Sequence, residues 1–423
     1  MLKNKFHYFL IFFFNFLLGQ GITNGYGLGS FLTFNGSTNA TAGLAELAPS
    51  FQKEVSVTNP TTWQDLKFTY LSVSYAYNLA NLNNSSAINE FSNLSNISWI
   101  IPIKSKTSIG LSLSPYSNQK INVGSKDTLV FSAFEDTLKT NNKIERFGGV
   151  MSFKVGGSRQ VSNKLNIGTQ FNFLFGSGRY DEIIQFESSP SVIINTRHRY
   201  TGLLSANYMS YKINEYLSLF GKYSFPLNPL NVAVLNRPIF EDTNGNNYHD
   251  YTTQQDFPHP DSLLVPKEDR LDGIHKPSEY SIAVEYKINS RAFLSTEMTQ
   301  LHEAGNYDLI KTPMNNSITK LTTHKLQLTQ FNDDLSLEFF DKFISRIGVQ
   351  AKTMSMDKNQ MEIKENALSL GVGFKFKKMG NQIDLNYYYG NRIYKNTQNK
   401  EIFQQFQLST SLADLWFVKR RQK

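Results

Sequence analysis

Short segments in which apolar and polar residues alternate recur along the whole chain. In LNIGTQFNFLF, residues 165–175, one parity is apolar apart from a threonine, and the other carries Asn166, Gly168, Gln170 and Asn172. A β-strand sends successive side chains to opposite faces, so the pattern predicts a strand with one apolar and one polar face. One such strand would also suit a half-buried soluble sheet, and the decisive signal is the length of the series.

Fourteen segments of this kind are predicted as strands. They lie near residues 66–78, 97–103, 107–116, 148–160, 164–176, 198–212, 215–225, 278–287, 291–301, 319–330, 344–354, 365–377, 381–391 and 401–417. Strands of about ten residues with alternating pattern and terminal aromatics are typical of transmembrane β-barrels. Because lipid offers no partner for a sheet edge, such a sheet has to close on itself.

The predicted connections alternate between short turns and long links. The short ones include IKSK, VSNK, KINE, INSR and KKMGN, and the long ones are 79–96, 117–147, 177–197, 226–277, 302–318, 355–364 and 392–400, with 331–343 as the exception. Outer-membrane barrels have short periplasmic turns and long external loops. We therefore predict an all-β fold, an antiparallel transmembrane β-barrel of about 14 strands over residues 66–417.

Composition excludes several other classes. The 423 residues contain no cysteine, so no disulfide scaffold or thiolate metal site is possible. Charged residues are 18% of the chain, and no internal run is long and apolar enough for a membrane helix. The net charge of +8 is spread out, without the dense basic block that indicates nucleic-acid binding.

The two ends have the features of an exported protein. Lys3 and Lys5 precede the apolar run FHYFLIFFFNFLL, and the small residues of GQG, residues 19–21, suit cleavage. We predict a signal peptide over residues 1–21, with a membrane anchor as the alternative, and therefore export to the outer membrane. Residues 418–423, VKRRQK, are predicted to be a basic periplasmic tail.

Residues 22–65 precede the first strand and are rich in Gly, Ala, Ser, Thr and Asn. Small residues permit tight turns and close packing, so we predict a plug inside the barrel lumen, with a flexible leader as the alternative.

The stretch AGLAELAPSFQKEVSVTNPTTW, residues 42–63, resembles the N-terminal region of the long-chain fatty-acid transporter family of outer-membrane proteins, the FadL, TodX and OMPP1 group. Its plug motif would be Asn59, Pro60 and Trp63, with Thr61 where the family has Ala. Residues 100–117 and 148–178 resemble the family's next hairpins. The resemblance implies a fourteen-stranded barrel with an N-terminal hatch, which passes hydrophobic molecules from an external site sideways into the membrane.

Residues 242–250, DTNGNNYHD, resemble a calcium loop. Asp242, Asn244, Asn246, the Tyr248 carbonyl and Asp250 stand at alternate positions, as oxygen ligands do in an EF-hand. Asn247 replaces the turn glycine and Thr253 replaces the final glutamate, so an ordinary polar external loop is the alternative. No cofactor is required by the sequence, and Ca²⁺ in this loop is the one candidate.

The surrounding link, 226–277, contains seven prolines and is predicted to be an external loop, since proline cannot donate to a ladder. Its apolar stretches 230–235 and 261–266 would form a hydrophobic external site or would simply pack within the loop.

Candidate lumen-lining residues are those on the polar parity of the strands. They are Asn166, Gln170, Asn172, Glu279, Glu285, Arg346 and Asp384, and Glu297 belongs to the same group. They would line a pathway or brace the barrel as ion pairs. Catalysis is not indicated, because Gly-Ser motifs lack the setting of a nucleophile elbow and His198, His302 and His324 have no identifiable partners.

Three functions remain open. The first is an outer-membrane channel for passive uptake of hydrophobic molecules such as long-chain fatty acids. The second is a binding or scaffold barrel, a secretion-associated shuttle or anchor that does not transport, and the third is a rim-sited lipid hydrolase. Expected partners are membrane lipid or lipopolysaccharide, a hydrophobic small molecule and the barrel-assembly machinery during insertion, with no nucleic acid.

Overall fold

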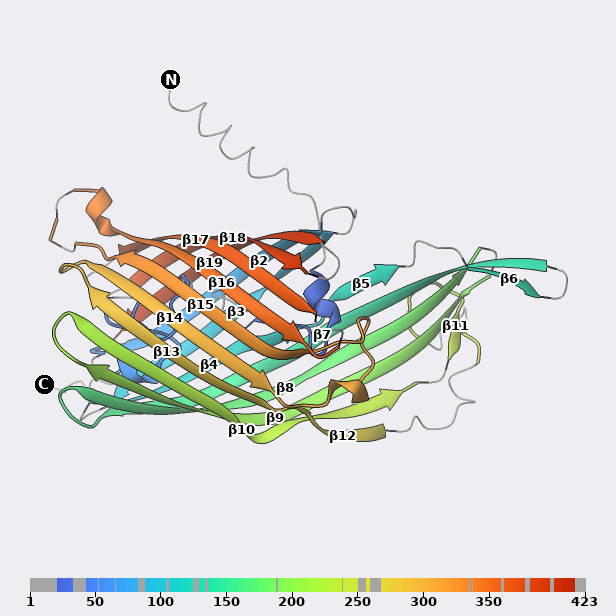
Figure 1. Ribbon diagram of the computed structural model, residues 1–423, viewed down its shortest axis with the longest axis horizontal. Coiled ribbons are helices and arrows are strands. Elements are labelled where there is room, and N and C mark those ends of the chain that lie inside the picture. Colours follow the sequence, from blue (N-terminus) through green and yellow to red (C-terminus); the bar gives the residue numbers. More distant parts are fainter. Residues whose placement is uncertain are drawn as a thin grey trace, which may run out of the picture.

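The protein is a closed antiparallel β-barrel of fourteen strands (Figure 1). The computed structural model describes residues 21–32, 43–51, 53–64, 66–82, 88–103, 106–124, 129–133, 136–187, 189–237, 239–249, 256–258, 268–333, 335–336, 338–358, 361–376, 381–395 and 399–414. The predicted signal peptide and basic tail lie outside these residues, apart from Gly21.

The barrel strands follow one another in chain order. They are β2 (Thr69–Leu82), β3 (Ile88–Ile103), β4 (Thr107–Asn118), β7 (Asp136–Gln160), β8 (Leu165–Phe186), β9 (Ser191–Lys212), β10 (Leu217–Asn236), β13 (Pro277–Lys287), β14 (Ala292–Glu303), β15 (Ile318–Gln330), β16 (Phe343–Met356), β17 (Glu362–Phe376), β18 (Asn381–Tyr394) and β19 (Lys400–Asp414). Pairing of β19 with β2, from Glu401 and Leu82 to Asp414 and Thr69, closes the barrel. All fourteen predicted strands are confirmed.

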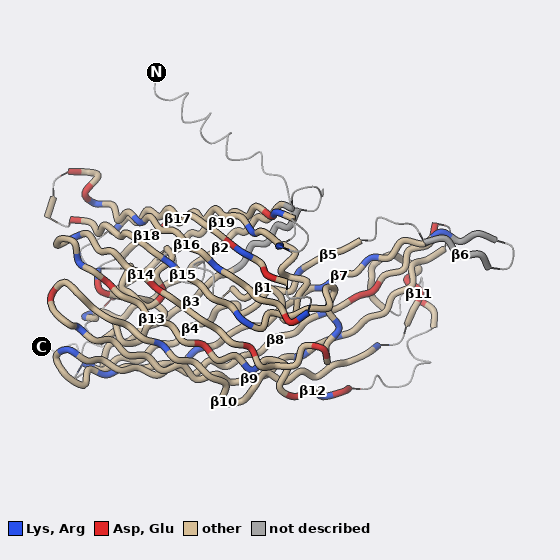
Figure 2. Tube along the Cα trace, in the orientation of Figure 1, with Lys and Arg blue, Asp and Glu red and all other residues tan. Residues whose placement is uncertain are grey.

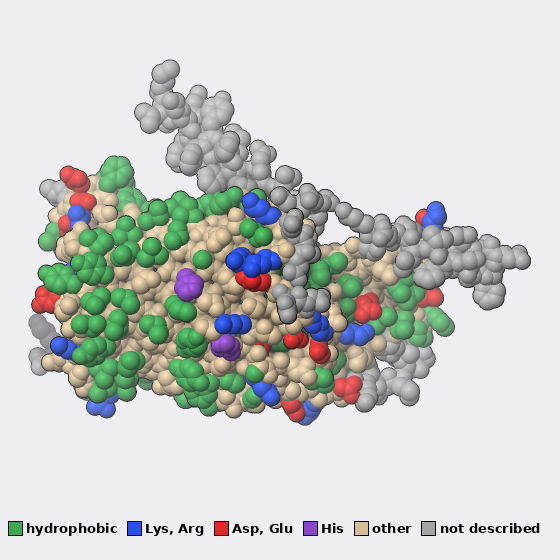
Figure 3. All heavy atoms as spheres, viewed as in Figure 1, with side chains coloured by type: hydrophobic (Ala, Val, Ile, Leu, Met, Phe, Trp, Pro, Cys, Tyr) green, Lys and Arg blue, Asp and Glu red, His purple; other side chains and the backbone are tan. Residues whose placement is uncertain are grey.

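The two parities of each strand face different surroundings. On β8, Phe171 and Phe173 are 42% and 44% exposed on the outside, whereas Asn166 and Gln170 are 5% and 4% exposed inside. Figure 3 shows hydrophobic side chains spread over the outer face of the barrel, with few charged ones among them. No helix among the described residues is long and apolar enough to cross a membrane.

The predicted long links lie at one end of the barrel, but much of their length is strand. β7, β8, β9 and β10 each have at least 20 residues and project past the other strands, at the right of Figure 1. The short strands β5 (Ile121–Gly124), β6 (Leu129–Ala133), β11 (Phe240–Asp242) and β12 (Glu268–His275) pair with this extension. The predicted links at this end are therefore largely continuations of the barrel hairpins.

The prediction that 226–277 is loop throughout was wrong at both ends. Pro226 and Pro229 lie within β10, where the register with β9 shifts between Pro226 and Asn228 and again before Asn231. Proline is tolerated in a strand at such bulges, where the ladder is already interrupted. β12 also lies in this range, and residues 259–267, with the whole apolar stretch 261–266, lie outside the described residues.

Parts of the N-terminal region lie against the inner wall of the barrel. We call residues 43–64 the inner segment and residues 21–32 the outer segment. The inner segment contains the one-turn helix η3 (Pro60–Thr62), and the outer segment contains η1 (Ile22–Gly25) and the short strand β1 (Ser30–Phe31). Figure 2 shows acidic and basic residues scattered over many strands and not gathered in one block.

Candidate functional site

The wall of the barrel is interrupted between β3 and β4. Their pairing runs from Ile103 and Thr107 only as far as Ile97 and Leu113, although β3 pairs with β2 on its other side up to Ile88. Among the described residues, none pairs with the β4 side of residues 88–96. We call this place the wall gap.

Two irregularities mark the point where the pairing ends. Ser95 is an extra residue in β3, because Ser74 and Tyr75 of β2 pair with Asn96 and Leu94. Tyr116 is an extra residue in β4, because Pro115 and Ser117 pair with Met151 and Val150 of β7. Bulges bend a strand and end pairing, and Pro115 has no N–H to donate. The wall gap therefore follows from local features of both strands.

The outer segment takes the vacated edge of β4. Its strand β1 pairs Ser30 with Asn118 and Phe31 with Ser117, and the Leu32 amide donates to the Tyr116 carbonyl over 2.9 Å. Gly29 makes this approach possible, because it has φ of +87° and a Cβ there would lie 2.0 Å from the Asn118 carbonyl oxygen. The wall gap thus faces the outer segment on the inside.

Behind β1 lies a large buried apolar cluster, which we call the outer cluster. Tyr26, Leu28 and Phe31 of the outer segment pack in it against inward side chains of the wall. The wall residues include Val150, Leu174, Leu204, Leu230, Val232, Val234, Ile274, Leu301, Ile318, Leu321, Met354 and Ile363. The lumen is therefore apolar at the level of the wall gap, unlike the polar lumen nearer the short turns.

A buried hydrogen-bond network connects the outer cluster to the external loops. His275 Nε2 lies 2.6 Å from the Tyr116 hydroxyl, and its Nδ1 lies 2.6 Å from the Tyr307 hydroxyl and close to Glu303. The Phe31 ring stacks on the imidazole at 5.4 Å. Burial and the Glu303 carboxylate raise the pKa of Tyr307 well above its usual value, so its hydroxyl stays protonated. The network holds β1, β4 and the external end of β14 together.

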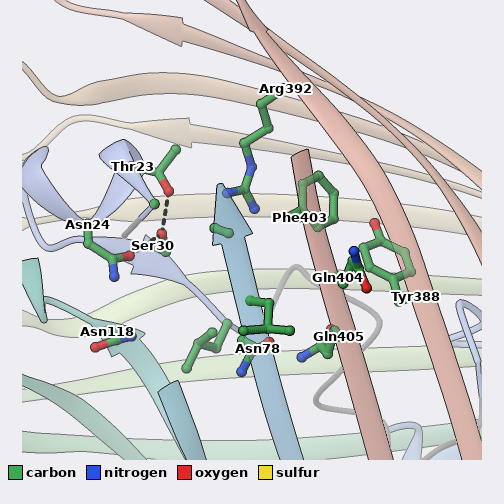
Figure 4. A pocket seen from close by; sticks show the side chains of 14 residues that line it. Thr23, Asn24, Ser30, Asn78, Asn118, Tyr388, Arg392, Phe403, Gln404 and Gln405 are labelled. Carbon is green, nitrogen blue, oxygen red and sulfur yellow. Dashed lines mark hydrogen bonds between the residues drawn. The ribbon is translucent and has the colours of Figure 1, made fainter. Parts of the chain in front are cut away.

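A small polar pocket of about 70 Å³ lies beside the outer segment (Figure 4). Asn24 and Ser30 line one side, where the Ser30 hydroxyl donates to Asn24 Oδ1 over 2.6 Å. Asn78 of β2 and Asn118 of β4 line it from the strands on either side of β3. Polar side chains of the outer segment and of the wall therefore lie together beside β1.

The inner segment contains the predicted motif residues, and they hold its fold. Asn59 is fully buried: its Oδ1 accepts from the Thr61 amide and hydroxyl, and its Nδ2 donates to the Leu47 carbonyl over 2.8 Å. Trp63 Nε1 donates to the Ser56 carbonyl over 2.7 Å. Thr61, which departs from the family motif, therefore adds a local hydrogen bond.

Two wall glycines receive the inner segment. A Cβ on Gly110 of β4 would lie 2.4 Å from the Trp63 ring, and a Cβ on Gly168 of β8 would lie 3.0 Å from Pro60 Cβ. The absence of side chains at these two positions lets the helical turn η3 approach the wall closely.

Buried ion pairs attach the inner segment to the opposite wall. Lys325 of β15 pairs with Glu46 and, at 3.4 Å, with Glu297 of β14. Arg346 of β16 donates from Nε to the Ser50 carbonyl over 3.0 Å and from Nη1 to Asp384 of β18 over 2.8 Å. The inner segment therefore bridges strands on several sides of the lumen.

The other predicted lumen residues all lie inside the barrel. Glu279 pairs with Lys222 at 2.6 Å, and Asn166 donates to the Thr61 carbonyl over 3.4 Å and to Ser210 over 3.2 Å. Gln170 accepts from the Tyr208 hydroxyl over 3.0 Å. Glu285 is buried, and Asn172 is half-buried beside a small central cavity. These side chains brace the barrel and do not converge on one site.

The predicted calcium loop is a compact turn. Asp242 accepts from the amides of Gly245 and Asn247 over 2.9 Å each and from that of Asn246 over 3.2 Å. Asn247 takes φ of +60°, the conformation that the turn glycine of a calcium loop requires. The Asp242 carboxylate thus accepts hydrogen bonds from three backbone amides. Asp250 lies outside the described residues, so calcium binding stays a prediction.

Sequence reasoning missed the residues that form the wall gap. Pro115 was the available signal, since a proline inside a predicted strand points to a bulge. Ser95 gave no such signal, because one extra residue in a strand is not visible in the alternation of apolar and polar residues. The His275 network gave none because it joins four segments that are far apart in the sequence. The histidines considered for catalysis are apart: His198 is buried, and His302 and His324 lie on the outer face.

A sequence model of the BamG family matches residues 1–423, the whole chain. The chain belongs to the BamG family. No curated protein matches its sequence. The BamG-family barrel is similar in fold to a Pseudomonas aeruginosa FadL homologue, with a TM-score of 0.56, 13% identity, and 92% of this chain and 99% of that chain covered.

Two further solved structures share the fold of this BamG-family chain. The P. putida toluene transporter TodX matches with a TM-score of 0.51 at 10% identity, covering 96% of this chain and 100% of its own. The CymD monoaromatic hydrocarbon channel matches with a TM-score of 0.52 at 9% identity, covering 94% and 98%. The resemblance predicted from the sequence thus holds for the fold, while the family is BamG. A closed barrel with this lipid-facing surface is an outer-membrane protein.

The Asn59 hydrogen bonds provide a test of the inner segment. Replacing Asn59 by Ala leaves the Leu47 carbonyl and the Thr61 donors without partners, and we expect the free energy of unfolding to fall by about 2–3 kcal/mol. Asn59→Asp keeps the acceptor and loses the donor, so its free energy of unfolding should lie between those of the wild type and of Asn59→Ala. Urea unfolding of the barrel in detergent, followed by its heat-dependent gel mobility, measures the change; equal stability of all three proteins would contradict the assignment.

Proposed function

We propose that this barrel is a passive outer-membrane channel for hydrophobic molecules, with a sideways exit through the wall gap. The wall gap is the observation that carries the proposal. Backbone without a ladder partner at membrane depth is tolerated only where it is buried in protein or lines a cavity. Residues 88–96, INEFSNLSN, carry polar side chains on both parities, which does not suit a strand face in contact with lipid.

The contents of the lumen support a sideways route over a straight one. The inner segment, which we interpret as the plug, and its buried ion pairs occupy the lumen nearer the short turns. The outer cluster lies at the level of the wall gap and offers apolar surface to a hydrophobic molecule arriving from outside. The molecule would displace Phe31 and leave between β3 and β4. The named relatives in fold include channels and transporters of aromatic hydrocarbons.

Uptake by cells tests this function. A deletion strain should take up labelled long-chain fatty acid or toluene more slowly than a strain that carries the gene, and the purified barrel in liposomes should restore permeation of at least one of them. Unchanged uptake of both classes in the deletion strain would count against the proposal.

A second candidate, the binding or scaffold barrel, is favoured by a polar patch on the lipid-facing surface. His324, Asn366 and Asn391 line a depression of about 600 Å³ together with Ala351 and Gly390. Histidine side chains are visible among the hydrophobic ones on the outer face in Figure 3. Polar side chains are costly against hydrocarbon, so a protein partner would stabilise them. A membrane protein that co-purifies with the wild type and is lost from His324→Leu/Asn366→Leu would support this function; no such protein would argue against it.

A further inference from the structure

Four arginines gather on the outward face of the barrel extension. Arg179 of β8 is the direct cross-strand neighbour of Arg197 of β9, and Arg199 lies two residues farther along β9. Arg237 follows the end of β10, and all four line a groove of about 420 Å³. We call it the arginine groove.

Among the described residues, carboxylates balance only part of the charge of the arginine groove. Arg179 lies 2.6 Å from Asp181, and Glu268 at the rim lies 3.5 Å from Arg270. Within the described part of the chain, no carboxylate lies within 4 Å of the other three arginines of the groove. Burial, together with Arg197 and Arg179, lowers the pKa of Arg237. Like charges directly opposite on neighbouring strands destabilise a sheet, so the arrangement calls for a bound anion.

The position of the groove specifies the kind of anion. On β8 the lipid-facing residues Phe171, Phe173 and Phe175 are followed on the same face by Ser177 and then Arg179. Four residues of a tilted strand rise about 10 Å, which places Arg179 at headgroup level above the apolar band. The predicted external end of the barrel makes this the outer leaflet.

The groove is also partly apolar. Phe147, Ala233 and Leu235 line it, and the Tyr248 ring lies 4.3 Å from the Arg179 guanidinium. Arginine binds phosphate through paired N–H donors, and the apolar lining suits the base of an acyl chain. A fully hydrated anion would gain nothing from that lining.

We propose that the arginine groove binds the phosphorylated headgroup of an outer-leaflet lipid, of the lipid A class. Arg197 and Arg199 hold the phosphate, Arg179 and Arg237 flank it, and the acyl chains run down over the apolar face of β8 and β9. This site is separate from the wall gap and does not depend on transport.

Binding of defined lipids to the full-length barrel in detergent tests the proposal. We compare diphosphoryl lipid A, the same lipid with its phosphates removed, and inorganic phosphate, by native mass spectrometry and by titration. Lipid A should bind, and Arg197→Gln/Arg199→Gln should weaken it by about a hundredfold, since two charge-assisted contacts are lost. Arg159→Gln/Lys164→Gln removes the same charge at the other end of the barrel and should leave binding unchanged.

Heat-dependent gel mobility establishes that both variants are folded, and a rising salt concentration should weaken wild-type binding. Equal affinity of the Arg197→Gln/Arg199→Gln barrel for lipid A, or equal binding of the dephosphorylated lipid, would overturn the proposal. Inorganic phosphate that binds as tightly as lipid A would show a free-anion site and would overturn it too.

Discussion

Deletion of Ser95 should lower uptake of hydrophobic molecules by about tenfold or more while the barrel still folds, because removing a bulge restores a regular ladder. Without Ser95, residues 88–94 keep their partners on β2 and continue straight alongside β4. The wall gap then narrows where the sideways exit is proposed. Uptake of labelled fatty acid and toluene by the deletion strain carrying this variant measures the effect.

The matched control fixes the inner segment instead of the wall. Pro60→Cys/Gly168→Cys places two cysteines in a chain that has none, with Cβ atoms close to disulfide distance. If molecules leave sideways, oxidation of this pair should not change uptake. Loss of uptake on oxidation, with normal uptake by the Ser95 deletion, would indicate passage through the whole lumen and would refute the sideways route.

Replacing Arg346 by Met should lower the free energy of unfolding by about 3–5 kcal/mol, because it leaves a buried carboxylate without its cation. Arg346 and Asp384 have side chains that are 1% and 0% exposed, and Arg346 also holds the Ser50 carbonyl of the inner segment. Urea unfolding in detergent measures the loss.

The double variant Arg346→Met/Asp384→Asn separates charge from packing. Neutralising Asp384 removes the buried negative charge that Arg346 no longer offsets, so the double variant should recover a large part of the lost stability. If the double variant is as unstable as Arg346→Met, the ion pair is not the cause of the loss.

The fold was predictable because each strand of a membrane barrel alternates between lipid-facing and lumen-facing residues, and this alternation is visible in the strand's own sequence. Phe171 and Phe173 meet lipid while Asn166 and Gln170 meet the lumen, and this difference is present in a single segment of sequence. Proline was misleading in β10, where bulges accommodate Pro226 and Pro229. The series of such strands, joined in turn by short and long connections, predicts that neighbours in the chain pair and that the sheet closes.

The wall gap was not predictable because no single strand specifies it in its own sequence. It depends on one extra residue in each of β3 and β4, and on the pairing of β4 with β1, which lies nearly ninety residues away in the chain. The His275 network likewise joins residues 31, 116, 275, 303 and 307. Pairings over such separations are decided by packing in three dimensions and leave no periodic trace.

The attachment of the inner segment to many strands has a consequence for biogenesis. Residues 43–64 are synthesised before any barrel strand, yet they contact β4, β8, β14, β15 and β16, and Phe51 packs on Tyr70 beside the β2–β19 seam. The barrel must therefore form around residues 43–64, which have to be in place inside the curving sheet before it closes. Closure of the seam and burial of that region become a single late event, and a chain lacking β19 would leave both unfinished.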